Sequence, residues 1–169
     1  MTLCDRSNIS QKIISPETRQ WLFPIAITLH NIEEAIGLPT FSAKLGIVTV
    51  SQEAFGFAVT GLTLFAYLIT YFSIKQGKES WATYVYHGYV LGMLLNIFFP
   101  HLLATLALQQ YAPGVITGIL INLPVMSYLL WHGFQHQYIS TPKFWFIAPI
   151  VALAIVLSIP LLFAVAGYF

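Results

Sequence analysis

The sequence WLFPIAITLHNIEEAIGL, at Trp21–Leu38, holds two adjacent acids inside an apolar run. About 20 apolar residues are enough to cross a membrane as a helix. A carboxylate near the centre of such a helix costs about 2.5–3.5 kcal/mol, whereas each Leu, Ile or Phe contributes only about 0.3–0.6 kcal/mol. Glu33 and Glu34 therefore cancel or exceed the gain from the apolar side chains around them. This helix needs partner helices, protonation or a bound cation to offset its polar groups.

The chain as a whole has the composition of an integral membrane protein. Of its 169 residues, 57% are hydrophobic and 8% are charged, whereas about a quarter of the residues in a soluble domain are charged. This composition excludes a disordered chain, a coiled coil and a nucleic-acid-binding protein that works through a basic face. Cys4 is the sole cysteine, which excludes an intramolecular disulfide and a thiolate metal cluster. Residues 1–20 are polar and do not predict a cleaved signal peptide, so we expect the first span to direct insertion.

Five apolar segments predict an all-α fold, a polytopic transmembrane helical bundle. The predicted spans are Trp21–Leu38, Ala54–Phe72, Trp81–Phe99, Gly114–Trp131 and Phe144–Phe169. We expect the third span to continue beyond Pro100 as one long, kinked helix that ends near Gln109. Since no repeat or low-complexity stretch divides the chain, residues 1–169 are expected to form a single domain with a short polar tail at 1–15.

The basic residues predict the orientation of this bundle. Lys and Arg favour the cytoplasmic side of a membrane. With the N-terminus in the cytoplasm, six of the 7 basic residues lie on the cytoplasmic side and Lys44 alone lies outside. We therefore expect a cytoplasmic N-terminus, an external C-terminus and a multi-pass protein of the plasma or inner membrane. The lipid bilayer is its expected partner, nucleic acid is not, and the sequence leaves the oligomeric state open.

The polar residues of the first span share one helix face. At about 100° per residue, Glu33 and Glu34 lie near −60° and +40° relative to His30. An imidazole and carboxylates that converge at low dielectric are good ligands for Zn²⁺, Fe²⁺ or Mn²⁺. The same residues can equally form a proton relay, or a polar patch that only fixes helix packing.

Residues of the third and fourth spans match the depth of this group. With a rise of about 1.5 Å per residue, Asn96 lies roughly 22 Å from the inner face, level with the acids. Thr117 lies in the same outer half, and His101 lies one to two turns farther out. Pro100 has no N–H, so the carbonyl of Asn96 loses its usual helical partner and must be satisfied by protein, water or ligand.

Three further histidines lie apart from this group. His87 shares a helix face with His101, but about 20 Å separates them along the helix, so it is only a secondary candidate. His132 and His136 have the i, i+4 spacing that can chelate a metal on a helix. Their surroundings, Trp131–His136, are typical of a helix end at the membrane interface.

Three ordered motifs carry a resemblance to a known family. They are HxxEE at His30–Glu34, an Asn…His element at Asn96–His101 and PGxxT at Pro113–Thr117. With these motifs, the chain resembles the HXXEE-motif family of membrane proteins over about residues 21–130. Four residues separate Asn96 from His101, whereas the family's element has three. The resemblance implies a multi-pass membrane protein and brings no established reaction.

The sequence favours a membrane enzyme with an intramembrane metal site. His30, Glu33, Glu34 and His101 would be the ligands of a divalent Zn, Fe or Mn ion, and Glu33 or Glu34 would be catalytic as the general base for a metal-bound water. Asn96 and Thr117 would orient these groups. A lipidic or isoprenoid substrate fits the location, with hydrolysis, isomerisation and oxidation all open. The alternatives are a proton- or cation-coupled transporter that uses the two acids as a relay, and a structural or accessory membrane subunit.

Overall fold

The computed structural model describes residues 16–46 and 50–166, and every regular element within these ranges is a helix. The polar tail expected at 1–15 and the last residues of the fifth span, 167–169, lie outside the described residues. The helices are α2 (Pro16–Gln20), α3 (Leu22–Leu45), α4 (Gln52–Gln76), α5 (Trp81–Asn96), η1 (Ile97–Leu102), α6 (Leu103–Leu108), α7 (Val115–Thr117), η2 (Gly118–Asn122), α8 (Leu123–Gln135) and α9 (Thr141–Ala166). The predicted all-α class is therefore confirmed.

Four helical stretches of the described residues are long and apolar enough to cross a membrane. They are Gln52–Gln76, Trp81–Leu108, Val115–Gln135 and Thr141–Ala166. The stretch Trp81–Leu108 confirms the expected long third helix, which ends one residue before Gln109. α3 is long enough at 24 residues, but its polar side chains, among them those at positions 30, 31, 33 and 34, lower its hydropathy. It nevertheless lies inside the bundle beside α4 and α8, as expected of the first predicted span, Trp21–Leu38.

Local sequence signals explain where these helices begin and end. The Ser51 hydroxyl accepts a hydrogen bond from the Ala54 N–H at the start of α4, and Ser80 does the same for Thr83 at the start of α5. Serine is a preferred residue at this position because its oxygen satisfies an otherwise unpaired N–H. α3 ends at Gly46, whose φ of 65° lies in the left-handed region that glycine adopts without strain.

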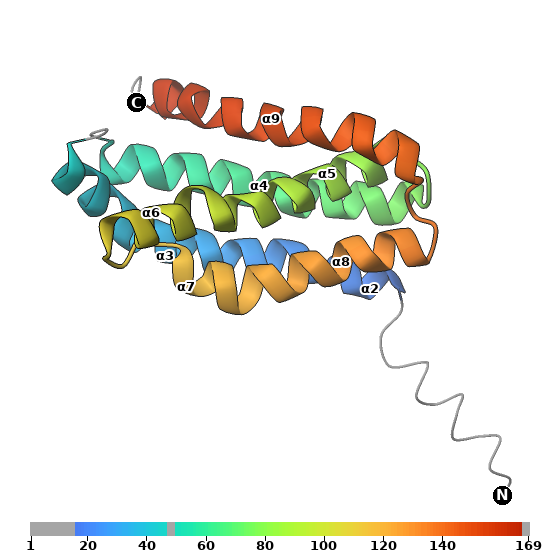
Figure 1. Ribbon diagram of the computed structural model, residues 1–169. Helices are drawn as coiled ribbons and strands as arrows, with labels where there is room; N and C mark the ends of the chain where they lie inside the picture. Colours follow the sequence, from blue (N-terminus) through green and yellow to red (C-terminus); the bar gives the residue numbers. More distant parts are fainter. Residues whose placement is uncertain (1–15, 47–49, 167–169) are drawn as a thin grey trace, which may run out of the picture.

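The long helices alternate in direction. α3, α5 and α9 run one way along the bundle, and α4 and the continuous stretch α7–η2–α8 run the other way (Figure 1). α2 and the end of α9 therefore lie at opposite ends of the bundle. Within the described residues, Lys44 lies at the end of the bundle where α3 finishes. The other basic residues lie at the opposite end: Arg19, Lys75, Lys78 and Lys143. This uneven distribution of basic residues agrees with the predicted orientation, in which the end with more of them is cytoplasmic.

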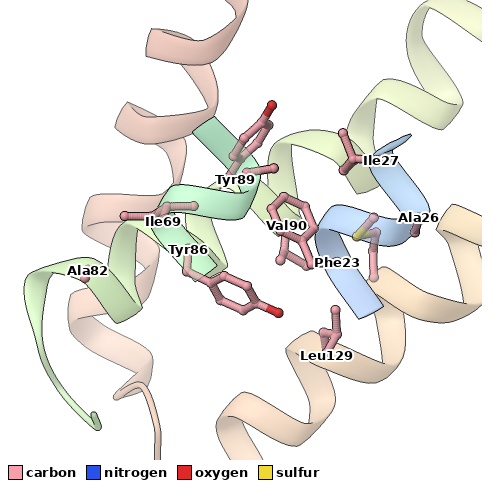
Figure 2. Close-up of a cluster of buried hydrophobic side chains, with 11 residues drawn as sticks. Phe23, Ala26, Ile27, Ile69, Ala82, Tyr86, Tyr89, Val90 and Leu129 are labelled. Atoms are coloured by element: carbon pink, nitrogen blue, oxygen red, sulfur yellow. The ribbon is translucent and has the colours of Figure 1, made fainter. Parts of the chain in front are cut away.

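Aromatic packing between α3 and α5 forms the centre of the core. The ring of Phe23 meets the rings of Tyr86 and Tyr89 edge to face, with centroids 5.3 and 5.0 Å apart, a favourable arrangement for aromatic pairs. Figure 2 shows these side chains together with Leu129 of α8. The Tyr86 hydroxyl donates to the carbonyl of Gln20, so its polar end is also satisfied.

α9 covers α4 and α5 and presents an apolar outer face. Gly88 allows a close approach, because a Cβ atom there would lie 2.7 Å from Cβ of Val151. On the outward side of α9, large apolar side chains such as Phe146 and Leu161 are 74% and 65% exposed. A surface of this kind is unfavourable in water and suits contact with lipid chains.

Candidate metal site

Two elements far apart in the sequence bring the polar residues of the bundle together. α3 carries His30, which is fully buried, and Glu34 one turn later, which is 9% exposed. η1 carries His101, which is 1% exposed. The residue before a proline is pushed towards extended backbone, and Phe99 indeed has φ −136° and ψ 116° in the middle of the third helix. His101 therefore follows a kink rather than a regular turn.

Four polar atoms surround one point of this site. The Glu34 Oε1 atom lies 2.9 Å from His101 Nε2 and 3.5 Å from His30 Nε2. The Asn96 Nδ2 atom lies 2.9 Å from His101 Nε2 and 3.3 Å from His30 Nε2. The two imidazole rings are nearly perpendicular, at 89°, so their Nε2 atoms approach from different directions. The ligand atoms of His30, Glu34 and His101 all lie within 4.8 Å of one another, close enough to hold a metal ion.

Four of the six separations among these atoms are similar to those between neighbouring ligands of a small tetrahedral site. Ligand bonds of about 2.0–2.1 Å at tetrahedral angles place neighbouring ligand atoms about 3.3 Å apart. The four distances given above lie between 2.9 and 3.5 Å. An asparagine amide can present oxygen in place of nitrogen by a half-turn of its terminal torsion. Asn96 can therefore act as a fourth oxygen ligand or as a hydrogen-bond donor beside three ligands.

Thr117 fixes the orientation of one imidazole. The His30 Nδ1 atom lies 2.9 Å from the Thr117 hydroxyl oxygen. When Nδ1 donates its proton to that oxygen, Nε2 keeps a lone pair that is directed at the centre of the site, on the side of Asn96. Histidines that bind metals are held in this way, with the second nitrogen donating to an oxygen.

Glu33 contacts a different part of the protein from Glu34. Its Oε2 accepts from the Thr117 N–H at 2.8 Å, and its Oε1 accepts from the Gly114 and Ile116 N–H groups at 3.0 and 3.3 Å and from the Tyr111 hydroxyl. The first N–H groups of a helix have no partner within it, and the positive end of the helix dipole favours an anion there. Glu33 therefore caps the stretch that begins at α7, and through Thr117 it supports His30.

The sequence predicts no role at the site for Tyr111 or Gly114, although Gly114 belongs to the PGxxT motif. Burial and the hydrogen bond to Glu33 raise the pKa of Tyr111 to about 12, so its hydroxyl remains a donor at neutral pH. Gly114 has φ 93°, and a Cβ atom there would lie 2.5 Å from Cε1 of His101. The PGxxT spacing marks the helix start, but it does not reveal that the glycine accommodates an imidazole from another helix.

The third and fourth long helices both depart from a regular α-helix near the site. η1 contains the kink at Phe99, between two helical stretches, and η2 is a π-helical segment of the fourth long helix. Such segments are rare and frequently lie at functional sites, because the wider turn redirects side chains. η1 carries His101, and η2 begins directly after Thr117.

The remaining histidines lie outside this group of ligands. His87 is 3% exposed, and its Nδ1 lies 2.8 Å from the carbonyl oxygen of Thr83. Its ring packs against Gly133 of α8. The rings of His132 and His136 lie with centroids 4.2 Å apart near the end of α8. Within the described ranges, the group of three metal-ligating side chains contains none of these residues.

Comparisons with known proteins point to one family. The family described as "Protein of unknown function with HXXEE motif" matches residues 21–129. The chain is also similar to the uncharacterized protein YrkK of Bacillus subtilis (strain 168), with 37% identity over 145 residues, which cover 85% of this chain and 92% of that protein. No solved structure matches the chain. The matched residues include every side chain of the site described above.

Proposed function

Because this chain belongs to the family of proteins with an HXXEE motif, we propose that it binds a divalent transition-metal ion with His30, Glu34 and His101. One observation carries this proposal: three buried atoms with lone pairs converge within 4.8 Å of one another. A carboxylate and two neutral imidazoles that face each other without a proton or a cation between them would repel one another. A bound ion turns this repulsion into attraction.

The ligand types favour particular ions. Two imidazoles and a carboxylate suit Zn²⁺ and Fe²⁺, and a carboxylate with an amide oxygen also suits Mn²⁺. If Asn96 is a ligand, the ion has four protein ligands. If Asn96 instead only donates a hydrogen bond, one coordination position stays open for water or substrate, which is the arrangement of catalytic sites.

For the case in which this position is open, we propose a metal-dependent enzyme with a lipidic substrate. A metal ion in such a site polarises a bound oxygen and lowers the pKa of bound water. Glu33 is a poor general base in this arrangement, because both of its oxygens already accept hydrogen bonds from the 111–117 segment. Glu34 and Asn96 are the groups beside the reacting position. The outward apolar surface of the bundle supports a substrate that arrives from the bilayer.

A metal-free acid–base site is the second candidate. The distance of 2.9 Å between Glu34 Oε1 and His101 Nε2 is also that of a charge-assisted hydrogen bond. A protonated His101 would then form an ion pair with Glu34, as a proton relay in a transporter requires. The interpretation as an accessory subunit has less support, since Glu34 faces His101 of its own chain rather than a partner.

Metal analysis of the purified protein separates these candidates. The full-length protein is purified in detergent after growth with Zn, Fe and Mn, and the metal-to-protein ratio is measured by mass spectrometry. We expect about one ion per chain in the wild type and in a control with His136→Ala, an exposed histidine outside the site, and less than a tenth of this in Glu34→Ala. An equally low ratio in the wild type and Glu34→Ala would reject the metal site in favour of the metal-free relay.

A further inference from the structure

A cavity of about 300 Å³ lies directly beside the His/Glu group. Its walls come from α3, α4, α5, η1 and α9. At one end it is polar, where Glu34, Asn96 and His101 contribute to its lining. The remaining walls are mainly apolar and include Leu62 of α4 and Ile155 of α9. A chamber with one polar end and apolar walls binds a molecule of the same character.

The cavity reaches the surface that faces lipid. Phe99 of η1 and Val156 of α9 line it and are themselves 71% and 59% exposed. Both lie in helices that are long and apolar enough to cross a membrane. A molecule dissolved in the bilayer can therefore enter sideways between η1 and α9 without passing through water.

The size and charge of the cavity narrow the class of ligand. A volume of about 300 Å³ is at the lower limit for organic ligands and too small for a lipid with two acyl chains. Among its lining residues the ionisable side chains are Glu34, His101 and Tyr89, and no Lys or Arg is present. Without a bound ion, a phosphate headgroup would meet a buried carboxylate with no basic side chain to offset it, which is unfavourable at low dielectric. A neutral hydroxyl can hydrogen-bond to Glu34 in that state and can also bind an ion when one is present.

We infer that this cavity binds a single-chain lipid with a small neutral head, such as a fatty or isoprenoid alcohol, with its hydroxyl at Glu34 and His101. This inference rests on the proposed function, because it places the head of the ligand at the proposed metal site. It names the substrate class of that site. The apolar chain lies between α4, α5 and α9, and the hydroxyl reaches the atoms that would hold the metal.

Photolabelling of the full-length protein in lipid nanodiscs tests this inference. The probe is dodecanol with a diazirine near its chain end, and the labelled peptides are identified by mass spectrometry. We expect labelling of the cavity walls on α4 and α9. Leu62→Trp fills the chamber and should reduce labelling at least five-fold, whereas Leu68→Trp, on the same helix but 52% exposed and outside the cavity, should leave it unchanged.

A second variant avoids the core. Val156→Trp narrows the exposed mouth, and it should also reduce labelling at least five-fold even if Leu62→Trp folds poorly. In protein stripped of metal with a chelator, unlabelled dodecanol should compete with the probe, whereas dodecanoic acid and a two-chain phosphatidylglycerol should not. Labelling that is unchanged in both cavity variants overturns the binding site, and equal competition by dodecanoic acid in the metal-free protein overturns the neutral head.

Metal content keeps this test separate from that of the proposed function. Leu62→Trp and Val156→Trp should retain the metal ratio of the wild type, since neither residue belongs to the ligand group. Specific labelling of a protein without metal would support the cavity and reject only the metal site. Metal binding without specific labelling would support the metal site and reject only the cavity as a binding site.

Discussion

Glu33 and Glu34 are adjacent in the sequence but have different partners. Glu34 lies against the two imidazoles, whereas Glu33 accepts four hydrogen bonds from the segment that begins α7. The difference follows from the angle of about 100° between successive helical residues, which directs one carboxylate to η1 and the other to α7. The motif thus contains a proposed metal ligand, Glu34, and a second acid, Glu33, that holds Thr117 in place. Thr117 in turn orients the proposed ligand His30.

The two acids should therefore respond differently to the same substitution. Glu34→Gln removes a charged ligand and should weaken metal binding more than about 100-fold, whereas Glu33→Gln should weaken it about ten-fold through the looser support of His30 by Thr117. Affinity is measured by competition with a coloured chelator. Equal losses in the two variants would contradict this division of roles.

We predict that metal binding requires a glycine at position 114, because a side chain there would collide with His101. Gly114→Ala places a Cβ atom against the His101 ring and forces alanine into left-handed backbone, which costs about 1–2 kcal/mol. Metal affinity should fall at least about ten-fold. Gly118→Ala is the matched control, because its Cβ would meet Ile97 at 3.4 Å and His30 only at 3.9 Å. A comparable loss in both variants would show that helix packing rather than His101 is responsible.

At the scale of elements, the helix ends are joined by polar contacts away from the site. The turn between α4 and α5 carries Glu79, which accepts from the Tyr84 hydroxyl at 2.8 Å and from Lys143 at the start of α9 at 3.0 Å. These two hydrogen bonds lower the pKa of Glu79, and the bond from Tyr84 has the larger effect. They connect the third and fifth long helices at the end where most basic residues lie.

This contact predicts a small effect that depends on pH. Since the pKa of Glu79 is lower in the folded protein than its ordinary value of 4.5, its stabilisation is present above pH 4.5 and is lost as the pH falls through the lowered pKa. Glu79→Gln should reduce the free energy of unfolding by less than about 1 kcal/mol at pH 7, because the pair is exposed. Thermal unfolding in detergent at pH 7 and pH 3 should show this difference disappear in acid. A difference that persists at pH 3 would refute the assignment to the charged pair.

Much of the fold could be predicted from the sequence because helix length and apolar periodicity are local properties. The long third helix and its kink at Pro100 are confirmed. Within the site, the i, i+4 spacing brings His30 and Glu34 together. The capping by Glu33 could not be predicted, because it depends on N–H groups more than 80 residues away whose position is set by helix packing.

At the scale of the whole molecule, the alternating helices predict that the two ends of the chain lie on opposite sides of the membrane. The basic residues predict that the end with Arg19 and Lys143 lies in the cytoplasm. Alkaline phosphatase fused to the C-terminus should therefore be active, and a fluorescent protein that folds only in the cytoplasm should be dark there. The reverse result would contradict the predicted orientation and the assignment of α3 as a membrane span.

His30, Glu34 and His101 are proposed to hold one metal ion between them, and X-ray absorption at the metal edge tests this claim. The spectrum of the purified full-length protein should show nitrogen and oxygen neighbours at about 2.0–2.1 Å, with outer scattering from two imidazoles. In His101→Ala, the contribution of one imidazole should disappear. A bound metal whose spectrum is unchanged in His101→Ala, or a wild-type protein that holds no metal, would contradict the claim.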